Sequence, residues 1–471
     1  MPKDLRSFIE QLANATPDQI QMITAEVEPK FGITAIAGKL AKQGRFPALL
    51  FTNVRGSSLP LVINLTASYE RLALALGTDV SELVRAYGQR QANPLPPRLV
   101  TEAPVQEVIL KGEKAKLSTL PIPTHNELDS GPYVTGGVLI CKDPDTGQYN
   151  AGIYRHEVQG EQQLGVYFQG SHHGGYIYRR YCEMNRPMEV AIAIGHYPTF
   201  ILGAVSKLPG SGGEFEEAGA LLGEPLELVK AKTVDLMVPA RAEIVIEGIM
   251  PPNETHFEGP FGEWPGYYVG EGEKPFMQVK TITMRRNAIY YDVFPANREH
   301  LVLGSLARMG SIYRRIKDVV PGVVNVNVPA YARTHCYISI RKGQEVEVKK
   351  AAFAALLTES ENFRFIVVVD DDIDVFNEPD VMWAIGTRFR PEKDLLVVNN
   401  WCGPGGLIPS GWEYFRDEAR TPIMASVMVI DATQPGAPSR YPPRAKPPED
   451  IGGRLRLEDL LRPFDIAAIK S

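Results

Sequence analysis

Short β-like segments separated by glycine and proline turns occupy residues 105–296 of the chain. Clear examples are "TGGVLICKD", "QLGVYFQG", "PMEVAIAIG", "AEIVIEGIM" and "FMQVKTITM". Short strands at this density are typical of a barrel or a sandwich. We therefore predict a β-barrel or sandwich domain in the middle of the chain.

Both flanking regions mix helical and β-like segments. Near the N-terminus, a helix is expected from about Asp4, "PALLFTNV" and "PLVINL" are β-like, and Ser68 is the expected N-cap of a helix in "SYERLALALG". After residue 304, strands such as "FRFIVVVD" and "DLLVVNN" alternate with helical stretches such as "EVKKAAFAALLTES". This alternation is typical of βα units. The fold class is thus a multidomain mixture of α/β and β structure.

We predict four parts in the chain. Residues 1–104 form an N-terminal α/β domain, 105–303 the central β domain, 304–434 a C-terminal α/β domain, and 435–471 a tail with a short final helix near Leu457. The linker "NPLPPRLVTEAPV" marks the first boundary, and the proline-rich "QPGAPSRYPPRAKPPEDIGG" marks the last. A length of 471 residues supports about three domains.

The charge balance and the N-terminus limit the classes of partner. The chain has 50 basic and 56 acidic residues, a formal net charge of -6, so we expect no binding of nucleic acid or of an anionic membrane. "MPKDLRSFIEQL" lacks the apolar core of a signal peptide, and no run is long enough for a membrane span, which predicts a soluble cytoplasmic protein. The cysteines show no CxxC spacing, which argues against a zinc ribbon or a dithiol site.

Two glutamates lie five residues apart in "HFEGPFGEWPGYY", residues 256–268. Glycines and prolines restrict or bend this backbone, while Phe261 and Trp264 supply apolar surface. A carboxyl group beside such surface is easier to protonate unless a cation pairs with it, and two acids with different pKa values are a common acid–base device. Glu258 and Glu263 are therefore candidate catalytic acids. The alternative is a surface turn with solvated glutamates.

A second candidate set lies in "NAGIYRHE". Residues an odd number apart in a strand point to opposite faces, so Asn150 and Arg155 can reach one site only if a bulge or turn lies between them. Arg155 could then pair with one of the loop glutamates and hold it ionised. The alternative is a surface arginine and an asparagine in a turn.

Two glycine-rich segments carry candidate metal or phosphate ligands. In "GSHHGGY", either His172 or His173 could bind a metal or a phosphate, although a structural role in a turn is the alternative. In "LPGSGGEFEEAGALLGEP", acids at a helix start suit a hard divalent cation, or they only complement the helix dipole. The run "DDDID" after "FIVVV" is interpreted as strand-end aspartates without a catalytic role.

The order of these residues resembles the UbiD family of decarboxylases. The resemblance rests on "NAGIYR", "SHHGG", "GGEFEEAGALLGEP" and "EGPFGEWPGYY", and it extends through "PARAEIVIEG", "DDDIDVF" and "WAIGTRFRP" over nearly the whole chain. It implies an N-terminal α/β domain, a central split β-barrel that holds the flavin, and a C-terminal α/β domain that often forms the dimer contact. A homodimer or higher homo-oligomer is expected.

The resemblance also implies the activity. UbiD-like enzymes use prenylated FMN to remove or add CO2 reversibly on α,β-unsaturated, aromatic or heteroaromatic acids, and a UbiX-like flavin prenyltransferase supplies the cofactor. A divalent ion, Mn2+ or Mg2+, would grip the flavin phosphate, with K+ nearby. The implied metal ligands are Asn150, His173 and Glu214; the implied cofactor contacts are these three with Ile153, Tyr154, Arg155, His172 and Arg388.

The implied catalytic network is Arg155, Glu258 and Glu263. In this interpretation Arg155 keeps Glu258 ionised, while Glu263 cycles between acid and carboxylate and delivers the proton that replaces CO2. The residues expected near the substrate are Trp264, His300 and Leu407 in "NWCGPGGLIPSG". Two other functions stay open at this point: an FMN-dependent split-barrel reductase, and a non-catalytic assembly subunit.

Overall fold

The computed structural model describes residues 2–168, 172–206, 213–359, 363–402 and 424–435, together with scattered positions beyond them. The chain divides into two compact units, Met1–Thr433 and Gln434–Ser471. The predicted helix near Leu457 lies outside the described residues.

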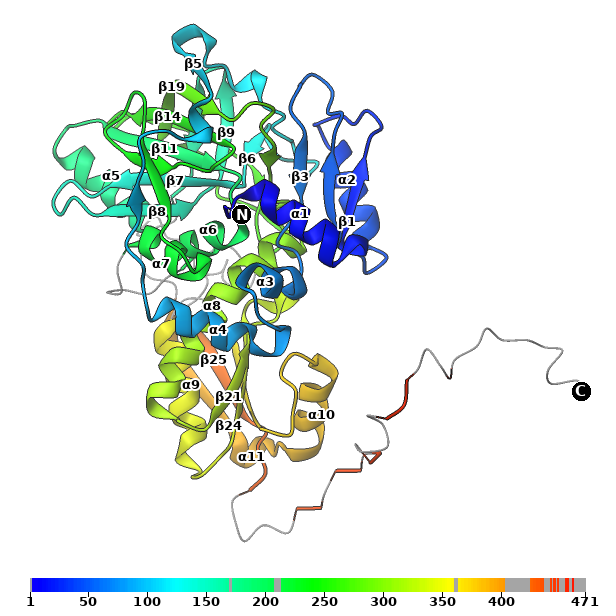
Figure 1. Cartoon of the computed structure of the whole chain (residues 1–471). Coiled ribbons are helices and arrows are strands. Elements are labelled where there is room, and N and C mark those ends of the chain that lie inside the picture. Colours follow the sequence, from blue (N-terminus) through cyan, green and yellow to red (C-terminus); the bar gives the residue numbers. More distant parts are fainter. Residues whose placement is uncertain are drawn as a thin grey trace, which may run out of the picture. The chain divides into compact units, whose positions relative to one another are not determined.

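A nine-stranded antiparallel sheet forms the centre of the first unit, and it curls into an open half-barrel (Figure 1). The strand order is β6-β9-β10-β19-β14-β11-β7-β8, and β5 pairs with β19. This confirms the predicted central β domain as a curled sheet rather than a sandwich. The strands are β5 Val108–Lys111, β6 Tyr133–Val134, β7 Gly137–Lys142, β8 Tyr149–Ile153, β9 His156–Gly160, β10 Gln163–Val166, β11 Met188–Ile194, β14 Ile244–Met250 and β19 Phe276–Met284.

Helices pack against one end of this sheet. Helix α6, Pro198–Ala204, packs on α7, Glu214–Leu222, and both contact β8. Helix α5, His173–Glu183, also contacts β8. Two small hairpins follow β14, and a three-stranded sheet joins β4, Arg98–Leu99, to β12, Glu227–Lys230, and β13, Met237–Pro239. Strand β8 therefore contacts three helices.

The N-terminal region is a four-stranded sheet with helices, as expected for an α/β domain. Its order is β1-β2-β3-β20, so the last strand comes from residues that follow the central sheet in the chain. Ser68 accepts a hydrogen bond from the N–H of Arg71 at 3.3 Å, which confirms it as the N-cap of α3. The elements are α1 Leu5–Ala15, β1 Ile20–Ile23, α2 Gly32–Ala41, β2 Ala48–Phe51, β3 Leu61–Ile63, α3 Tyr69–Leu76, α4 Leu83–Gln91 and β20 Tyr290–Tyr291.

The C-terminal region is a five-stranded mixed sheet of order β21-β22-β23-β25-β24 with helices. Helix α8 contacts both α4 and α9 and so joins this region to the N-terminal helices. The predicted boundary at residue 303 falls inside α8, and the four-part division stays a prediction. The elements are α8 Arg298–Val319, β21 Val323–Asn327, β22 His335–Ile340, α9 Val346–Thr358, β23 Phe365–Asp370, α10 Glu378–Arg388, α11 Pro391–Asp394, β24 Leu395–Cys402 and β25 Met424–Asp431.

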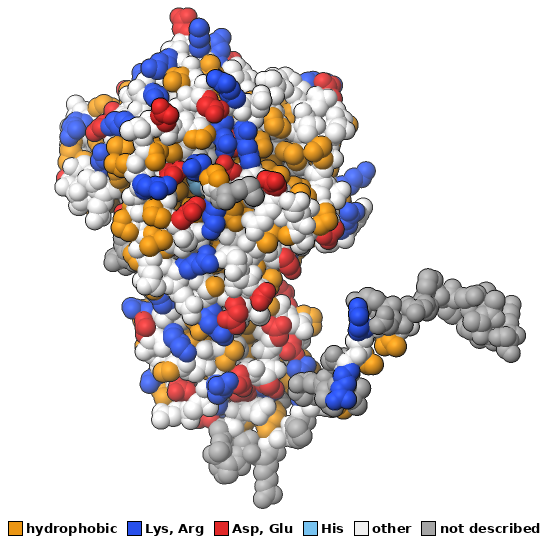
Figure 2. Space-filling view, in the orientation of Figure 1, with side chains coloured by type: hydrophobic (Ala, Val, Ile, Leu, Met, Phe, Trp, Pro, Cys, Tyr) orange, Lys and Arg blue, Asp and Glu red, His pale blue; other side chains and the backbone are white. Residues whose placement is uncertain are grey.

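The described surface carries charges of both signs. On the face seen in Figure 2, Lys and Arg side chains are interspersed with Asp and Glu side chains and form no continuous basic patch. Within the described part of the chain, no helix is long and apolar enough to cross a membrane.

The buried carboxylate of Glu299 ties the first turn of α8 to the N-terminal region. Its oxygens accept hydrogen bonds from the N–H groups of Asn64 at 2.6 Å and Thr66 at 2.9 Å, and from the Tyr291 hydroxyl at 3.1 Å. The buried N–H groups of Asn64 and Thr66 would lose this acceptor if the carboxylate were removed. Glu299 is therefore a structural acid, distinct from the candidate catalytic pair.

We expect Glu299→Gln to lower the free energy of unfolding by about 1–3 kcal/mol, because an amide NH2 cannot accept the N–H groups that face it. Urea unfolding followed by circular dichroism measures the change. Glu10→Gln, which replaces an exposed acid on α1, is the matched control and should change stability little. Equal stability of the two variants would contradict the role given to Glu299.

Candidate active site

Arg155 and Glu258 form a buried bidentate ion pair. Nε of Arg155 donates to Oε1 of Glu258 at 2.9 Å, and Nη2 donates to Oε2 at 2.7 Å. The two residues are 7% and 0% exposed. The predicted pairing of Arg155 with a loop glutamate is confirmed, and its partner is Glu258.

The end of β8 explains how Arg155 reaches this position. Strand β8 ends at Ile153 and β9 begins at His156, so Arg155 lies in the break between two strands. The alternation of side chains along β8 therefore does not force Asn150 and Arg155 onto opposite faces of the sheet. The turn that the sequence required between these residues is present.

The Arg155 guanidinium is held on all sides. It lies over the ring of Tyr167 at 4.1 Å and over that of Phe261 at 4.9 Å, and it donates to the carbonyls of Val269 and Gly270 at 3.2 Å each. Burial opposes its charge, but the hydrogen bonds and charge of Glu258 outweigh that effect and raise the pKa of Arg155. Arg155 is therefore a fixed cation, oriented by stacking as well as by its partner.

The segment that carries both glutamates is two short hairpins instead of an irregular loop. Strand β15, His256–Glu258, pairs with β18, Gly272–Lys274, while β16, Phe261–Gly262, pairs with β17, Tyr268–Val269. Gly259, with φ of +90°, makes the bend after Glu258 in the left-handed region that favours glycine.

Two buried acids missed by the sequence hypothesis brace this turn. Oδ1 of Asp129 accepts the N–H of Gly262 at 2.8 Å, and Oε2 of Glu157 accepts the N–H of Gly259 at 3.3 Å. No motif in the sequence singles out either residue. Their hydrogen bonds fix the backbone on both sides of Phe261.

Glu263 has a different environment from Glu258. It is half-buried, its Oε1 accepts the N–H of Trp264 at 3.1 Å, and no ion pair within the described ranges includes it. Burial raises the pKa of Glu263; the positive charges of Arg155 and Arg333 oppose this rise, and the charge of Glu258 adds to it. One acid is thus locked in an ion pair and the other can exchange a proton.

Asn150 and Glu214 lie together at the other end of β8. Nδ2 of Asn150 donates to Oε1 of Glu214 at 3.0 Å, and the N–H of Ala151 lies 3.3 Å from Oε2. Burial raises the pKa of Glu214, while nearby N–H groups and the charge of His173 lower it. His173 is the first residue of α5 and is exposed.

Tyr154 links this pair to the histidine segment. Its hydroxyl donates to Oδ1 of Asn150 at 3.4 Å and accepts the N–H of Gly174 at 3.2 Å, and its ring lies 5.4 Å from that of His172. The structure therefore brings the predicted ligand residues of three separate segments to one place.

The three acids in the first turn of α7 have different hydrogen-bond partners. Glu216 accepts the N–H of Gly213 at 3.1 Å and caps the helix, and Glu217 accepts the Ser206 hydroxyl at 2.7 Å. Only Glu214 bonds to Asn150. No group of three or more His, Cys, Asp or Glu residues suited to a metal occurs in the described part of the chain. The predicted ligand set differs from such a group because it includes the amide of Asn150.

Arg388 lies in different surroundings from the other predicted cofactor residues. It is the last residue of α10, and its buried guanidinium pairs with Asp370 at 2.9 Å and Asp372 at 2.6 Å. Asp370 ends β23, and Asp372 follows it. These ion pairs place it in the C-terminal sheet region, and its predicted contact with a phosphate stays a prediction. They also agree with a structural role for the "DDDID" run.

Of the predicted substrate-pocket residues, two are described. Trp264 lies under Arg333, whose Cζ is 4.8 Å from the indole ring centre, and His300 lies in the first turn of α8. Leu407 lies outside the described residues. Arg333 was not predicted, because nothing in its local sequence "YARTH" distinguishes it from a surface arginine.

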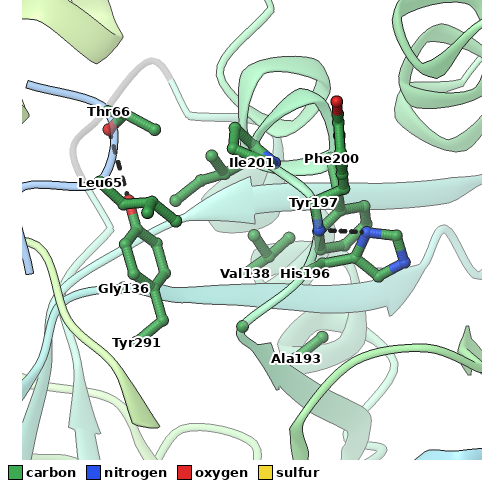
Figure 3. A pocket seen from close by; sticks show the side chains of 12 residues that line it. Leu65, Thr66, Gly136, Val138, Ala193, His196, Tyr197, Phe200, Ile201 and Tyr291 are labelled. Atoms are coloured by element: carbon green, nitrogen blue, oxygen red, sulfur yellow. Dashed lines mark hydrogen bonds between the residues drawn. The ribbon is translucent and has the colours of Figure 1, made fainter. Parts of the chain in front are cut away.

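A mainly apolar cavity lies beside β7 (Figure 3). Leu65 and Thr66 from the N-terminal region face Val138 across it, and Phe200 and Ile201 of α6 close another side. None of its lining residues belongs to the Arg155–Glu258 pair or to the hairpins. Val138 is the register partner of Ile153, so the cavity borders the strand pair that carries the candidate ligands.

Comparisons with known proteins show matches over most of the chain. Models of the 3-octaprenyl-4-hydroxybenzoate carboxy-lyase N-terminal, Rift-related and C-terminal domains match residues 13–91, 98–298 and 301–432. An uncharacterized protein of Synechocystis sp. is 32% identical over 430 residues, which cover 84% of this chain and 85% of that protein.

Solved structures also match nearly the whole chain. An evolved dimeric form of the UbiD-class enzyme HmfF from Pelotomaculum thermopropionicum, in complex with prFMN, is 35% identical with a TM-score of 0.86, covering 98% of this chain and 100% of that one. Apo 3,4-dihydroxybenzoic acid decarboxylase from Klebsiella pneumoniae is 28% identical with a TM-score of 0.85, covering 96% and 99%.

We expect Glu258→Gln to lower the free energy of unfolding by about 3–5 kcal/mol, because it leaves the buried Arg155 cation without its anion. Chemical unfolding of the purified protein measures this loss. Glu263→Gln, on the same hairpins, should lose less, because Glu263 has no ion-pair partner among the described residues. An equal loss in both variants would show that the ion pair contributes nothing special to stability.

Proposed function

The chain belongs to the UbiD family of carboxy-lyases, and we propose that it decarboxylates a planar α,β-unsaturated, aromatic or heteroaromatic acid, reversibly, with prenylated FMN. The proposal rests on one observation: the two acids on the hairpins, Glu258 and Glu263, have different environments. Glu258 is locked to Arg155 by two hydrogen bonds, while the pKa of Glu263 is raised and its proton can exchange. Reversible proton transfer needs one acid that can gain and lose a proton beside a second acid that stays ionised.

The relatives support the same reaction class. The HmfF structure holds prFMN, and the Klebsiella pneumoniae enzyme is named a decarboxylase of 3,4-dihydroxybenzoic acid. Both align over nearly the full length of this chain. A homo-oligomer is proposed on the same ground, since one HmfF form is dimeric.

The residues around β8 fit a divalent ion. Asn150 and Glu214 each carry a side-chain oxygen, and Nδ2 of Asn150 lies 3.0 Å from Oε1 of Glu214. The nearby imidazole of His173 adds a nitrogen ligand. Oxygen with imidazole suits Mn2+ or Mg2+. Burial alone makes the Glu214 carboxylate unfavourable, and a bound cation would reverse that effect. We propose that these three residues would hold the ion, with K+ nearby, and that its charge would offset the negative charge of the flavin phosphate.

When bound, prenylated FMN supplies the electron sink for the carbon atom that loses CO2. This chain's residues then handle charge and protons. Arg155 holds Glu258 ionised and in one orientation. As the C–C bond to CO2 breaks and its electron pair stays with the substrate carbon, Glu263 donates its proton to that carbon and becomes a carboxylate, which water reprotonates. Carboxylation is the same sequence in reverse.

Cofactor loading provides the first test. We expect the protein produced together with a flavin prenyltransferase to bind a modified flavin and to release CO2 from members of a panel of benzoic, hydroxybenzoic, furoic, pyrrole, phthalic and cinnamic-type acids. Absorbance spectra, mass spectrometry of the released flavin and CO2 assays measure the three outcomes. Absence of bound flavin with and without the prenyltransferase would refute the proposal.

Glu263→Gln should retain cofactor and lose about 100-fold to 10,000-fold of the decarboxylation rate, the usual contribution of a general acid. Exchange of the substrate C–H with deuterated water should fall in parallel. Because the pKa of Glu263 is raised and delivery needs its protonated form, the wild-type rate should fall as pH rises through that pKa. Glu254→Gln, at an exposed position, is the control. Full activity of Glu263→Gln would exclude it as the proton donor.

A further inference from the structure

A loop of residues 126–130, here called the bracing loop, presses one buried acid against the two hairpins of the candidate site. Glu127, Leu128 and Ser130 are exposed, whereas Asp129 is only 9% exposed. A buried carboxylate is costly unless donors surround its oxygens, so an acid that turns inward from an exposed loop must have partners. The hairpins and the loop itself supply them.

Both carboxylate oxygens of Asp129 accept hydrogen bonds. Oδ1 accepts the N–H of Gly262 at 2.8 Å, while Oδ2 accepts the N–H of Asn126 at 2.8 Å and its Nδ2 at 3.4 Å. The Asn126 side chain also packs against strand β16, because a Cβ on Gly262 would lie 2.6 Å from its Nδ2. Asp129 therefore joins the start of its own loop to the strand that precedes Glu263.

Two further contacts hold the bracing loop to the same segment. The N–H of Ser130 donates to the carbonyl of Pro260 at 3.0 Å, and the N–H of Leu128 donates to the Tyr268 hydroxyl at 3.1 Å. These bonds reach the residues on either side of β16 and on its partner strand β17. The hairpin is thus held at three points by one loop.

The bracing loop starts from a rigid base. His125, the residue before it, is buried, and its Nε2 lies 2.8 Å from Oδ2 of the buried Asp292. The other oxygen of Asp292 accepts the Thr135 hydroxyl at 2.7 Å, and the carbonyl of His125 accepts the Thr34 hydroxyl at 2.7 Å. These bonds fix the loop to the N-terminal region and to the central sheet, independently of the hairpins.

The position of Glu263 depends on this support. Glu263 directly follows Gly262, whose N–H is the group that Asp129 holds. Among the contacts of the described residues, the Glu263 carboxyl group accepts one hydrogen bond, from the N–H of the next residue, Trp264. Such a local bond moves with the backbone and does not fix the carboxyl group relative to the rest of the site. The backbone at Gly262 therefore sets where this acid lies.

We propose that Asp129 is a positioning residue for proton transfer: it holds the N–H of Gly262 and thereby places the carboxyl group of Glu263 against the substrate carbon. The inference rests on the proposed function and deepens it. A proton donor must lie within hydrogen-bond reach of the atom that receives the proton, and a misplacement of about 1 Å can cost about 100-fold in rate. Glu258 is fixed separately, by its ion pair with Arg155.

The test compares Asp129→Asn with Glu247→Gln in the cofactor-loaded protein, with the acid of the panel that the wild-type protein turns over fastest. An asparagine at position 129 keeps the shape of the side chain but has one acceptor oxygen instead of two. Glu247 is a buried acid that accepts the N–H groups of Lys232 at 2.9 Å and Thr233 at 2.6 Å. Glu247→Gln therefore removes the same kind of support from a different loop.

Both variants should lose stability, but only Asp129→Asn should lower kcat, by about 10-fold to 100-fold, with KM and cofactor content little changed. Its solvent deuterium isotope effect on kcat should exceed that of the wild-type protein, because proton delivery becomes the slow step. A wild-type kcat in folded Asp129→Asn, or an equal loss of kcat in both variants, would overturn the inference.

A second pair of variants tests the same contact without changing Asp129. In Gly262→Ala the new Cβ meets the Asn126 side chain, and rotation of the terminal amide leaves Cγ at 3.1 Å, so the loop and the hairpin must separate. This variant should reproduce the loss of kcat, and the double variant Asn126→Ala/Gly262→Ala should recover most of it. If Asp129→Asn does not fold, this pair decides. A wild-type rate in Gly262→Ala, or a loss that the double variant keeps in full, would overturn the inference.

Infrared titration of the Glu263 carboxyl group separates this inference from the proposed function, because it needs no turnover. A loosened hairpin admits water, so Asp129→Asn should move the titration toward the ordinary range of glutamate, and Glu247→Gln should leave it unchanged. If no acid releases CO2 but the titration moves in Asp129→Asn alone, the decarboxylase proposal fails and the positioning role stands. If acids release CO2 and Asp129→Asn changes neither kcat nor the titration, the positioning role alone fails.

Discussion

The buried ion pair between Arg155 and Glu258 is the constraint around which the candidate site is built. Two charges this far from water are tolerated only if their geometry is held and their other hydrogen-bonding groups are satisfied. The fold meets this requirement with two aromatic rings, two backbone carbonyls and a bidentate contact. The break between β8 and β9 places the arginine, and the hairpins after β14 place the acid.

Once this pair is fixed, the remaining groups differ in what they can do. Glu258 cannot leave its arginine without exposing a buried cation, so it serves to orient. Glu263, five residues later, has neighbouring charges but forms no ion pair with any residue that the structure describes, and burial favours its protonated form. Arg333 lies over Trp264 of the same hairpins, and its Nη1 has no hydrogen-bond partner among the described residues.

The sequence predicted elements whose signals are local. The strands of the central sheet, the N-cap at Ser68 and the order of the polar residues in "NAGIYR" and "EGPFGEWPGYY" could all be read within short windows. The contacts that complete the site were beyond such windows. Asp129 and Arg333 approach the hairpins from distant segments, and β20 completes a sheet that begins at β1. The helix α8 crosses a predicted boundary because its first turn is bonded to the N-terminal region through Glu299. A short motif also drew attention to Arg388, which the fold pairs with two aspartates, and its contact with a phosphate stays a prediction.

The most direct test of the division between the two acids is an infrared difference spectrum between wild-type protein and Glu263→Gln, recorded with the cofactor bound across a range of pH. We predict a protonated-carboxyl band that shifts in deuterated water and titrates at a pH above the ordinary range for glutamate. This band should be absent in the variant. A spectrum with no carboxyl band assignable to Glu263 at any pH above that ordinary range would contradict it.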